Sequence, residues 1–379
     1  MERKLYQYIF LIFFAFLTGY TFLVRASFYD EEGLPRFQQT SLRVMGENLA
    51  ADYALFRLLE SKTKPSEAYQ SEKISSFLHK TIHADGRFYS YASPMKAFIS
   101  VPFLYLPYNS FCETWIFWGL FLSGISLYTL LPLKVSLLLI FAFPAVFLSF
   151  ISGGWGVFLA SAVVLSLTLS EAYPKSAGFF AALCMVEPIA FILLTATFFF
   201  RRQFKAALTA VCSGIAFIGA GWARYGLEAF EEAFKSAWQV FSETPCLLSS
   251  FSSALMCSGL PLALSVVLQT ALVFAVVYFG IRVFHNTACS QSVQDAYLCA
   301  ALCLISPFTS LGDYGLLYAG VAFLMRDQEA RGVLKGEVPF LLTAFLSIYL
   351  ESFWIRLSGA SLQLFLAVVL LWISYRRSR

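Results

Sequence analysis

SLRVMGENLAADYALFRLLES (residues 41–61) opens the longest polar interval of an otherwise apolar sequence, and ADGRFYSYASPMKAFISVPFLYLP (84–107) closes it. In the first stretch, apolar residues recur at steps of three, four, seven and three, which predicts one face of an amphipathic helix. These residues are Leu42, Met45, Leu49, Phe56 and Leu59. Asp52 stands where the step of seven leaves a gap. A carboxylate on an apolar face is costly unless it is used, so Asp52 is the first candidate functional residue.

The composition is that of a membrane protein. Of the 379 residues, 59% are hydrophobic and only 13% are charged. Apolar runs of membrane-spanning length recur, and an open chain in lipid satisfies its backbone only by forming helices. We therefore expect an all-α polytopic membrane protein with a single integral domain over residues 1–379. The net charge of +4 is scattered over loops, which argues against nucleic acid as a partner.

Loop charges set the expected orientation. MERK precedes a long apolar run at 5–26, which we interpret as an uncleaved first span with the amino terminus in the cytoplasm. The first outer loop, 27–110, carries the Asp52 helix, expected to lie along the membrane surface. With a second outer loop at 224–259, we expect about twelve spans and both termini inside. The later full spans are expected at 111–131, 135–151, the segment after the SGGWG turn (152–156), 206–223, 260–284, 294–309, 313–326, 338–355 and 359–375.

A glutamate-proline pair interrupts one apolar run. As a single span, residues 177–200 would place the basic cluster RRQFK (201–205) outside, against the positive-inside rule. Proline breaks a helix, and a glutamate within the membrane lines a wet cavity rather than lipid. We therefore expect two half-helices, 178–187 and 189–200, which turn at Glu187 and return the arginines to the cytoplasm.

With this topology three carboxylates, Asp52, Glu187 and Asp313, fall on the outer side. Apolar neighbours should raise the proton affinity of Asp52, which suits a general base. The alternative is an acid that pairs with Arg57 or caps a helix. The corresponding alternative for Asp313 is a helix N-cap for the segment GLLYAG.

Cysteine and histidine give weaker signals. Among 8 Cys no CxxC pair or Cys/His cluster occurs, so most are interpreted as small buried hydrophobic residues. Cys246 and Cys257 fall in the second outer loop, where a disulfide between them is one alternative. His79 and His83 are four residues apart with Asp85 nearby, but two histidines without a firm third ligand are more often surface residues. We expect no metal site.

Motifs in a fixed order resemble those of the GT-C glycosyltransferases, most closely family 87, the polyprenyl-phosphate-mannose-dependent mannosyltransferases. In the first outer loop they are DYALF (52–56), Ala68-Tyr69 and FYSYASP (88–94), with further prolines at 102 and 107. Later segments that keep the order are SGGWGVFLA, VEPIAFILLTATFFFRRQFKAAL, WARYGLEAF and SPFTSLGDYGLLYAG. The resemblance spans about residues 48–320. Three positions depart from it: Trp155 replaces the usual Gln, Glu187 the usual Lys, and Gly312 the usual Tyr.

The resemblance implies a GT-C-like helical bundle that transfers a hexose, mannose in the family, from a polyprenyl-phosphate carrier to a glycolipid or envelope-glycan acceptor with inversion. Asp52 matches the position of the family's outer-loop base. Outer-side cations would stabilise the leaving phosphate, with Arg224 the first choice. The cation candidates are Arg57, Arg87, Lys96, Arg224 and Arg356, and Tyr91, Glu187 and Asp313 are further candidates for substrate contacts.

The implied location is the inner (plasma) membrane, with an active site that faces the periplasm or the outside. The implied partners are the lipid-linked donor, the acceptor and membrane lipids, and no cofactor is expected. No Gly-rich turn or soluble domain that would bind a nucleotide sugar is present in the sequence. Two alternatives stay open. One is a lipid or solute transporter, because broken helices also suit transporters; the other is a catalytically silent GT-C-like scaffold.

Overall fold

The computed structural model describes residues 47–379 except 85, 144–145, 147–148, 151–152 and 359–360. Every regular element in these ranges is helical. The expected span at 5–26, with the first part of the outer loop, lies outside the described residues. The helices of the bundle are α6 (Tyr108–Tyr128), α7 (Leu133–Ala142), α9 (Gly156–Thr168), α10 (Pro174–Leu183), α11 (Pro188–Phe200), α12 (Phe204–Glu243), α14 (Leu262–His285), α15 (Gln291–Ile305), α16 (Leu316–Arg331), α17 (Glu337–Ser358) and α18 (Leu362–Arg377). The other helices are α2 (Glu47–Glu60), α3 (Pro65–Ala68), α4 (Ser71–Ile82), α5 (Pro94–Ser100) and α13 (Phe251–Cys257), and the 3-10 turns are η1 (Val101–Phe103), η2 (Cys184–Val186), η3 (Pro245–Leu247) and η4 (Leu311–Gly315).

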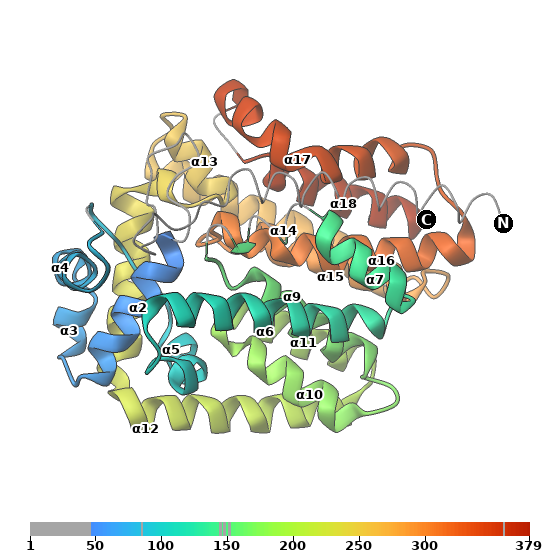
Figure 1. The fold of residues 1–379 in the computed structure, drawn as a ribbon. Helices are drawn as coiled ribbons and strands as arrows, with labels where there is room; N and C mark the ends of the chain where they lie inside the picture. The colour runs from blue at the N-terminus through green and yellow to red at the C-terminus, as the bar shows by residue number, and fades with distance from the viewer. Residues whose placement is uncertain (1–46, 85, 144–145, 147–148, 151–152, 359–360) are drawn as a thin grey trace.

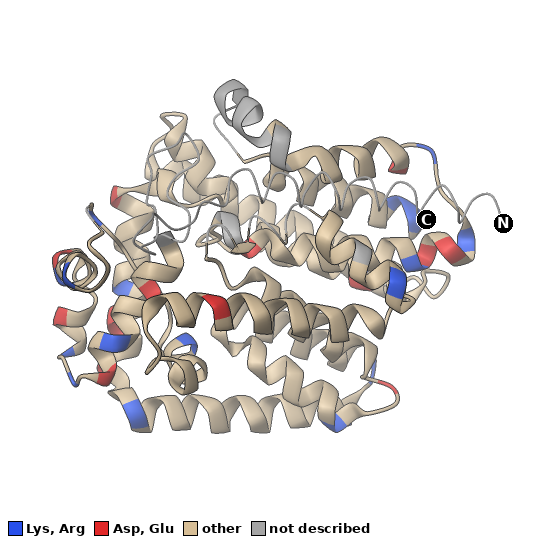
Figure 2. Cartoon of the chain, viewed as in Figure 1, with Lys and Arg blue, Asp and Glu red and all other residues tan. Residues whose placement is uncertain are grey.

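The residue ranges of these helices overlap those of the expected apolar spans from 111–131 onward. In the described part of the chain α6, α12 and α14 are long and apolar enough to cross a membrane by length and composition. Figure 2 shows charged residues mostly at the two ends of the bundle, with few along the helices between them. The all-helical architecture is therefore confirmed, while the count of about twelve spans stays a prediction.

Helix α12 bends between the bundle and the outer-loop helices. Gly226 has a φ of 78° and a ψ of 164°, which interrupts the helix. The part before Gly226 runs along the bundle, and the part after it crosses the end where α2, α3 and α4 gather (Figure 1). The expected end of a span near residue 223, followed by an amphipathic outer segment, matches this bend.

The half-helices around Glu187 form as predicted. Helix α10 and the turn η2 end at Glu187, whose φ of −126° and ψ of 94° are extended, and α11 starts at the proline that follows. A Cβ atom at Gly178, early in α10, would lie 2.5 Å from the carbonyl oxygen of Ala206, early in α12. A Cβ at Gly214, two turns further along α12, would lie 2.8 Å from the ring of Phe191, early in α11. The chain thus turns at Glu187, and α11 returns to the end of the bundle where α10 begins.

The expected surface position of α2 is wrong. All side chains from Leu49 to Phe56 are buried, so the helix has no solvent-facing or lipid-facing side along these two turns. The reason is the segment 62–87 in the middle of the polar interval. It contains α4, whose buried Ile74 and Leu78 belong to the same hydrophobic cluster as α2. The described part of the first outer loop is therefore a small packed subdomain rather than a helix lying on lipid.

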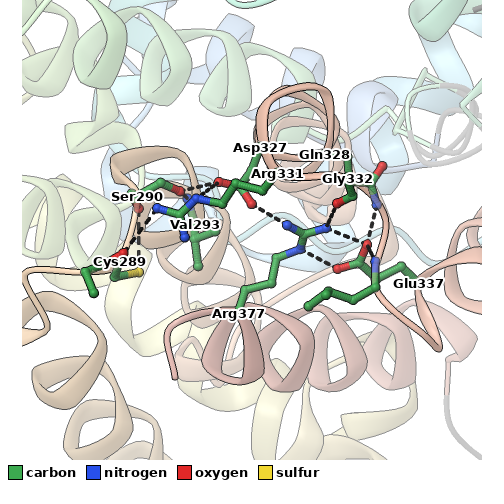
Figure 3. A network of polar contacts seen from close by, with 11 residues as sticks. Cys289, Ser290, Val293, Asp327, Gln328, Arg331, Gly332, Glu337 and Arg377 are labelled. Carbon is green, nitrogen blue, oxygen red and sulfur yellow. Dashed lines mark hydrogen bonds and ion pairs between the residues drawn. The ribbon is translucent and has the colours of Figure 1, made fainter.

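The opposite end of the bundle is fastened by a buried ionic network (Figure 3). The guanidinium of Arg377 on α18 donates to the carboxylates of Asp327 on α16 and Glu337 on α17, and all three side chains are buried. It also donates to the carbonyl oxygen of Gly332 at 2.7 Å. Arg377 is thus a structural cation that joins α16, α17 and α18.

Candidate active site

A cavity at the outer-loop end of the bundle brings together four of the predicted site residues. Asp52 on α2, Tyr91 in the loop before α5, Lys96 on α5 and Asp313 in η4 all line it. Trp155, which precedes α9, completes the wall beside Asp52. The cavity has room for about one water molecule in this conformation.

Two glycines allow these segments to meet. Gly153, in the turn before α9, has a φ of 71°, and a Cβ atom there would lie 2.3 Å from the Cβ of Leu49 on α2. In the same way, a Cβ at Gly315 would lie 2.5 Å from the carbonyl carbon of Gly156. Only glycine accepts both the close contact and, at position 153, the left-handed backbone. The close contacts of Gly153 and Gly315 thus hold α2, the start of α9 and η4 together. Asp52 lies on α2, Trp155 directly precedes α9, and Asp313 lies in η4.

The carboxylate of Asp52 is buried, and both of its oxygens accept a hydrogen bond. The Ser90 hydroxyl donates to Oδ1 at 2.7 Å, and the Trp155 indole N–H donates to Oδ2 at 3.3 Å. Burial raises the pKa of Asp52 from 3.8 to about 6, although the positive charge of Lys96 and these two hydrogen bonds act in the opposite direction. The carboxylate is therefore ionised at neutral pH, yet basic enough to accept a proton from a hydroxyl as it reacts.

The segment that presents Ser90 to Asp52 is itself held in place. The Tyr69 hydroxyl donates to the carbonyl oxygen of Ala92 at 2.9 Å. The hydroxyl of Ser236, on α12, donates to the backbone carbonyl oxygen of Ser90, also at 2.9 Å. This segment is thus anchored by two residues from other parts of the chain.

Lys96 is the cation of the site. Its Nζ lies 2.6 Å from Oε1 of Glu187, and it is buried. Burial alone would lower the pKa of Lys96, but the charges of Glu187, Asp313 and Asp52 outweigh that effect and raise the pKa, so the ammonium stays charged. Glu187 lines a second, mostly apolar cavity, and Asp313 lines both cavities.

Asp313 takes part in a helix cap, but it is not the N-cap residue that its alternative predicted: Ser310 is the N-cap of η4, and Asp313 is the third residue of that turn. Its Oδ2 accepts hydrogen bonds from the backbone N–H and the hydroxyl of Ser310, both at 2.8 Å, which makes a capping box at the start of η4. Asp313 therefore completes the capping box of Ser310 and contributes a carboxylate to both cavities.

Three of the four arginines predicted to bind the donor phosphate lie elsewhere. Arg57 donates to the carbonyl oxygen of Leu104 at 2.8 Å, and Arg87 is exposed and pairs with Glu72. Arg224, our first choice, pairs with Glu60 on α2 at 2.7 Å. Each ties one part of the first outer loop to another part or to α12, and none lines the Asp52 cavity. The side chain of Arg356 lies outside the described residues.

The remaining sequence signals have structural positions. His79 lies on the exposed side of α4, and His83 ends that helix. In the described ranges no three His, Cys, Asp or Glu side chains are grouped as metal ligands. Cys246 and Cys257 form a disulfide bridge between η3 and the end of α13, the alternative that we had left open.

The model of glycosyltransferase family 87 matches residues 91–307, more than half of the chain. The chain belongs to glycosyltransferase family 87. The match supports a GT-C-like membrane glycosyltransferase and includes Tyr91, Lys96, Trp155 and Glu187, whereas Asp52 lies well before it and Asp313 shortly after it. Both acids nevertheless line the same cavity as Tyr91, Lys96 and Trp155, which lie within the matched region. No curated protein and no solved structure matches the chain.

Sequence reasoning missed two serines of this family 87 site, Ser90 and Ser310. Each bonds an acid that was predicted as a site residue. For Ser310 the spacing to Asp313 is a usable signal, because Ser-x-x-Asp is a capping-box pattern. Ser90 lies between two tyrosines, and nothing in its spacing from Asp52 indicates the contact.

Proposed function

We propose that this family 87 protein transfers a hexose, preferably mannose, from a polyprenyl-phosphate carrier to a hydroxyl of a glycolipid or envelope glycan, with inversion at the anomeric carbon. The observation that carries the proposal is the buried carboxylate of Asp52, which shares one cavity with the Lys96 ammonium. A proton acceptor beside a fixed cation suits a displacement in which an oxygen is deprotonated while a phosphate departs.

The proposed step is a single displacement at the anomeric carbon. The acceptor oxygen forms a bond to that carbon, its proton passes to Asp52, and the bond from the carbon to the phosphate oxygen breaks. The electron pair of the broken bond leaves with the polyprenyl phosphate, whose extra negative charge is offset by Lys96. A displacement of this kind inverts the configuration, because the acceptor attacks the face opposite the leaving phosphate.

Ser90 and Trp155 have supporting roles in this proposal. By donating to the two oxygens of Asp52 they fix the orientation of the carboxylate, and each oxygen keeps a lone pair for the incoming proton. Tyr91 and Asp313 line the same cavity and are placed to contact the sugar or acceptor hydroxyls.

We further propose that the Asp52 end faces the periplasm or the outside of the plasma membrane. Two observations support this orientation. The disulfide between Cys246 and Cys257 lies in a segment that contacts the site end, since Ser249 N donates to the carbonyl oxygen of Thr309 at 2.8 Å, and disulfides persist in oxidising compartments. Lys and Arg residues are also present at the other end of the bundle (Figure 2), as is typical of cytoplasmic loops.

The test is a transfer assay on the full chain. Purified protein in lipid nanodiscs is incubated with radiolabelled polyprenyl-phosphate-mannose and, separately, the glucose carrier, together with an extract of membrane lipids. We expect label to move into a lipid or glycan acceptor with wild type and not with Asp52→Asn. If no carrier gives transfer with wild type, the proposal fails. Carrier flipping across the bilayer without transfer would instead identify a transporter.

A further inference from the structure

The acidic surroundings of Lys96 present a problem for a phosphate-bearing substrate. Three carboxylates, from Asp52, Glu187 and Asp313, lie around one buried ammonium. A bound phosphate would add further negative charge to a site that already holds three carboxylates and one ammonium. Such a concentration of negative charge is unfavourable in a poorly solvated site. One of the carboxylates therefore has to leave Lys96 when such a substrate binds.

The hydrogen bonds indicate which carboxylate leaves. Asp52 is held by Ser90 and Trp155, and Asp313 by two bonds from Ser310. In contrast, the one contact recorded for the Glu187 carboxylate among the described residues is its 2.6 Å ion pair with Lys96. The Glu187 side chain is also the more accessible partner, 29% exposed against 8% for Lys96.

The ion pair also lies between two cavities of different chemistry. Lys96 lines the polar cavity of Asp52, whereas Glu187 lines the second cavity, whose walls are mostly apolar and include Leu159, Ile189 and Leu302. Each cavity alone has room for about one water molecule, so neither accepts a sugar as it stands. A lipid-linked sugar has three matching parts in sequence: a polar sugar, an anionic phosphate and an apolar chain.

We propose that Glu187 is a displaceable counter-ion, which neutralises Lys96 in the empty site and gives up its place to the phosphate of the lipid-linked donor, so that the two cavities join. The inference rests on the proposed function. The sugar then lies on the Asp52 side, the phosphate on Lys96, and the first part of the lipid chain in the cavity of Glu187. The first turn of α11, which supplies Ile189 and Ala190 to that cavity, directs its positive dipole end toward the same place.

The proposal predicts an unusual sign for one substitution. Glu187→Gln removes the charge that competes with the phosphate while its amide oxygen still accepts a hydrogen bond from Lys96. The KM for the donor and the inhibition constant of sugar-free polyprenyl phosphate should both fall by about tenfold. A residue that contacts the substrate directly would change both constants in the opposite direction. Lys96→Met should raise both, because it removes the cation itself.

The experiment measures donor KM and polyprenyl-phosphate inhibition in nanodiscs for wild type, Glu187→Gln and a control. The control is Glu232→Gln, which removes a carboxylate from another 2.6 Å lysine pair, with Lys235, away from both cavities. It should match wild type. If Glu187→Gln does not fold, Glu187→Met keeps most of the volume, has no charge, and should also lower both constants.

The outcomes separate the two proposals. Transfer by wild type together with an unchanged or raised donor KM in the Glu187 variants would overturn the counter-ion role and leave the proposed function standing. Absence of both transfer and polyprenyl-phosphate binding in wild type would overturn the proposed function, and the counter-ion role with it. A fall in both constants, limited to the Glu187 variants, would support the inference.

Discussion

Replacing Asp52 with asparagine should separate activity from stability. Asparagine keeps the shape of the side chain but cannot take a proton from the acceptor, so we expect the transfer rate to fall at least about a hundredfold. The ionised carboxylate is costly in its buried position, since burial raises its pKa from 3.8 to about 6. That shift corresponds to about 3 kcal/mol at pH values above 6. The neutral amide would avoid this cost and lose about 1 kcal/mol with one of the two hydrogen bonds. The variant should thus be as stable as wild type, or more stable.

The same pKa gives a pH profile for wild type. A folded-state pKa above the unfolded value means that the native protein binds the proton more tightly, so the stability cost of the charge is relieved as pH falls from above 6 toward 4. Activity follows the opposite course because the base must be ionised. The kcat/KM for transfer should be half-maximal near pH 6 and about one tenth of its plateau at pH 5. Because the charges of Lys96 and Asp313 also act on Asp52, the midpoint of the pH profile belongs to these coupled groups together.

Two measurements decide this prediction. Transfer from labelled donor in nanodiscs gives the rate, and thermal unfolding followed by intrinsic fluorescence gives the stability of the same preparations. If Asp52→Asn keeps more than about one tenth of the wild-type rate, Asp52 is not the base. If it loses both rate and thermal stability, the carboxylate has a structural role and the burial argument is wrong.

Three further predictions concern the surroundings of the site and the far end of the bundle. Trp155→Phe removes a hydrogen bond to the ionised base, so the midpoint of the acidic side of the kcat/KM profile should rise by about half a unit. Arg377→Ala leaves two buried carboxylates without their cation and should cost about 3–5 kcal/mol of stability, measured as a loss of melting temperature, whereas the exposed Arg376→Ala should cost far less. Gly153→Ala should cost about 1–3 kcal/mol through overpacking, and should reduce transfer, whereas Gly259→Ala has a similar φ but open space and should cost less.

Each of the three has an outcome that contradicts it. A pH profile of Trp155→Phe that overlays that of wild type would mean that the indole does not act on the carboxylate. Equal melting temperatures for the Arg377 and Arg376 variants would show that the network of Figure 3 does not stabilise the fold. An active, stable Gly153→Ala would show that α2 and the turn that contains Gly153 can move apart without loss of activity or stability.

The helices and the interruption at Glu187 could be predicted from the sequence because the physical cause is local. Apolar length determines where a helix can cross lipid, and proline at position 188 removes a helix hydrogen bond wherever it falls. The grouping of Asp52 with Asp313 also followed from topology, since alternation of spans placed both acids on one side. In these cases the sequence pattern and the tertiary structure report the same constraint.

The partners of the cations could not be predicted in this way. Arg224 and Lys96 are both basic residues of outer segments, and nothing local distinguishes them. In the structure the first pairs with Glu60, distant in sequence, while the second is buried against Glu187. The burial of α2 was missed for a related reason. Its cover comes from α4, whose few apolar residues are spread through a stretch rich in charge.

The contacts of Gly153 and Gly315 limit how proteins built on this plan can diverge. Neither residue has a side chain that could touch a substrate, yet a single methyl group at either one would push apart the segments that carry the reacting groups. A saturation mutagenesis scan should therefore score these two positions as intolerant, alongside the acids themselves. Engineering toward a new sugar or acceptor would do better to leave the glycines in place and vary Tyr91, whose side chain lines the cavity.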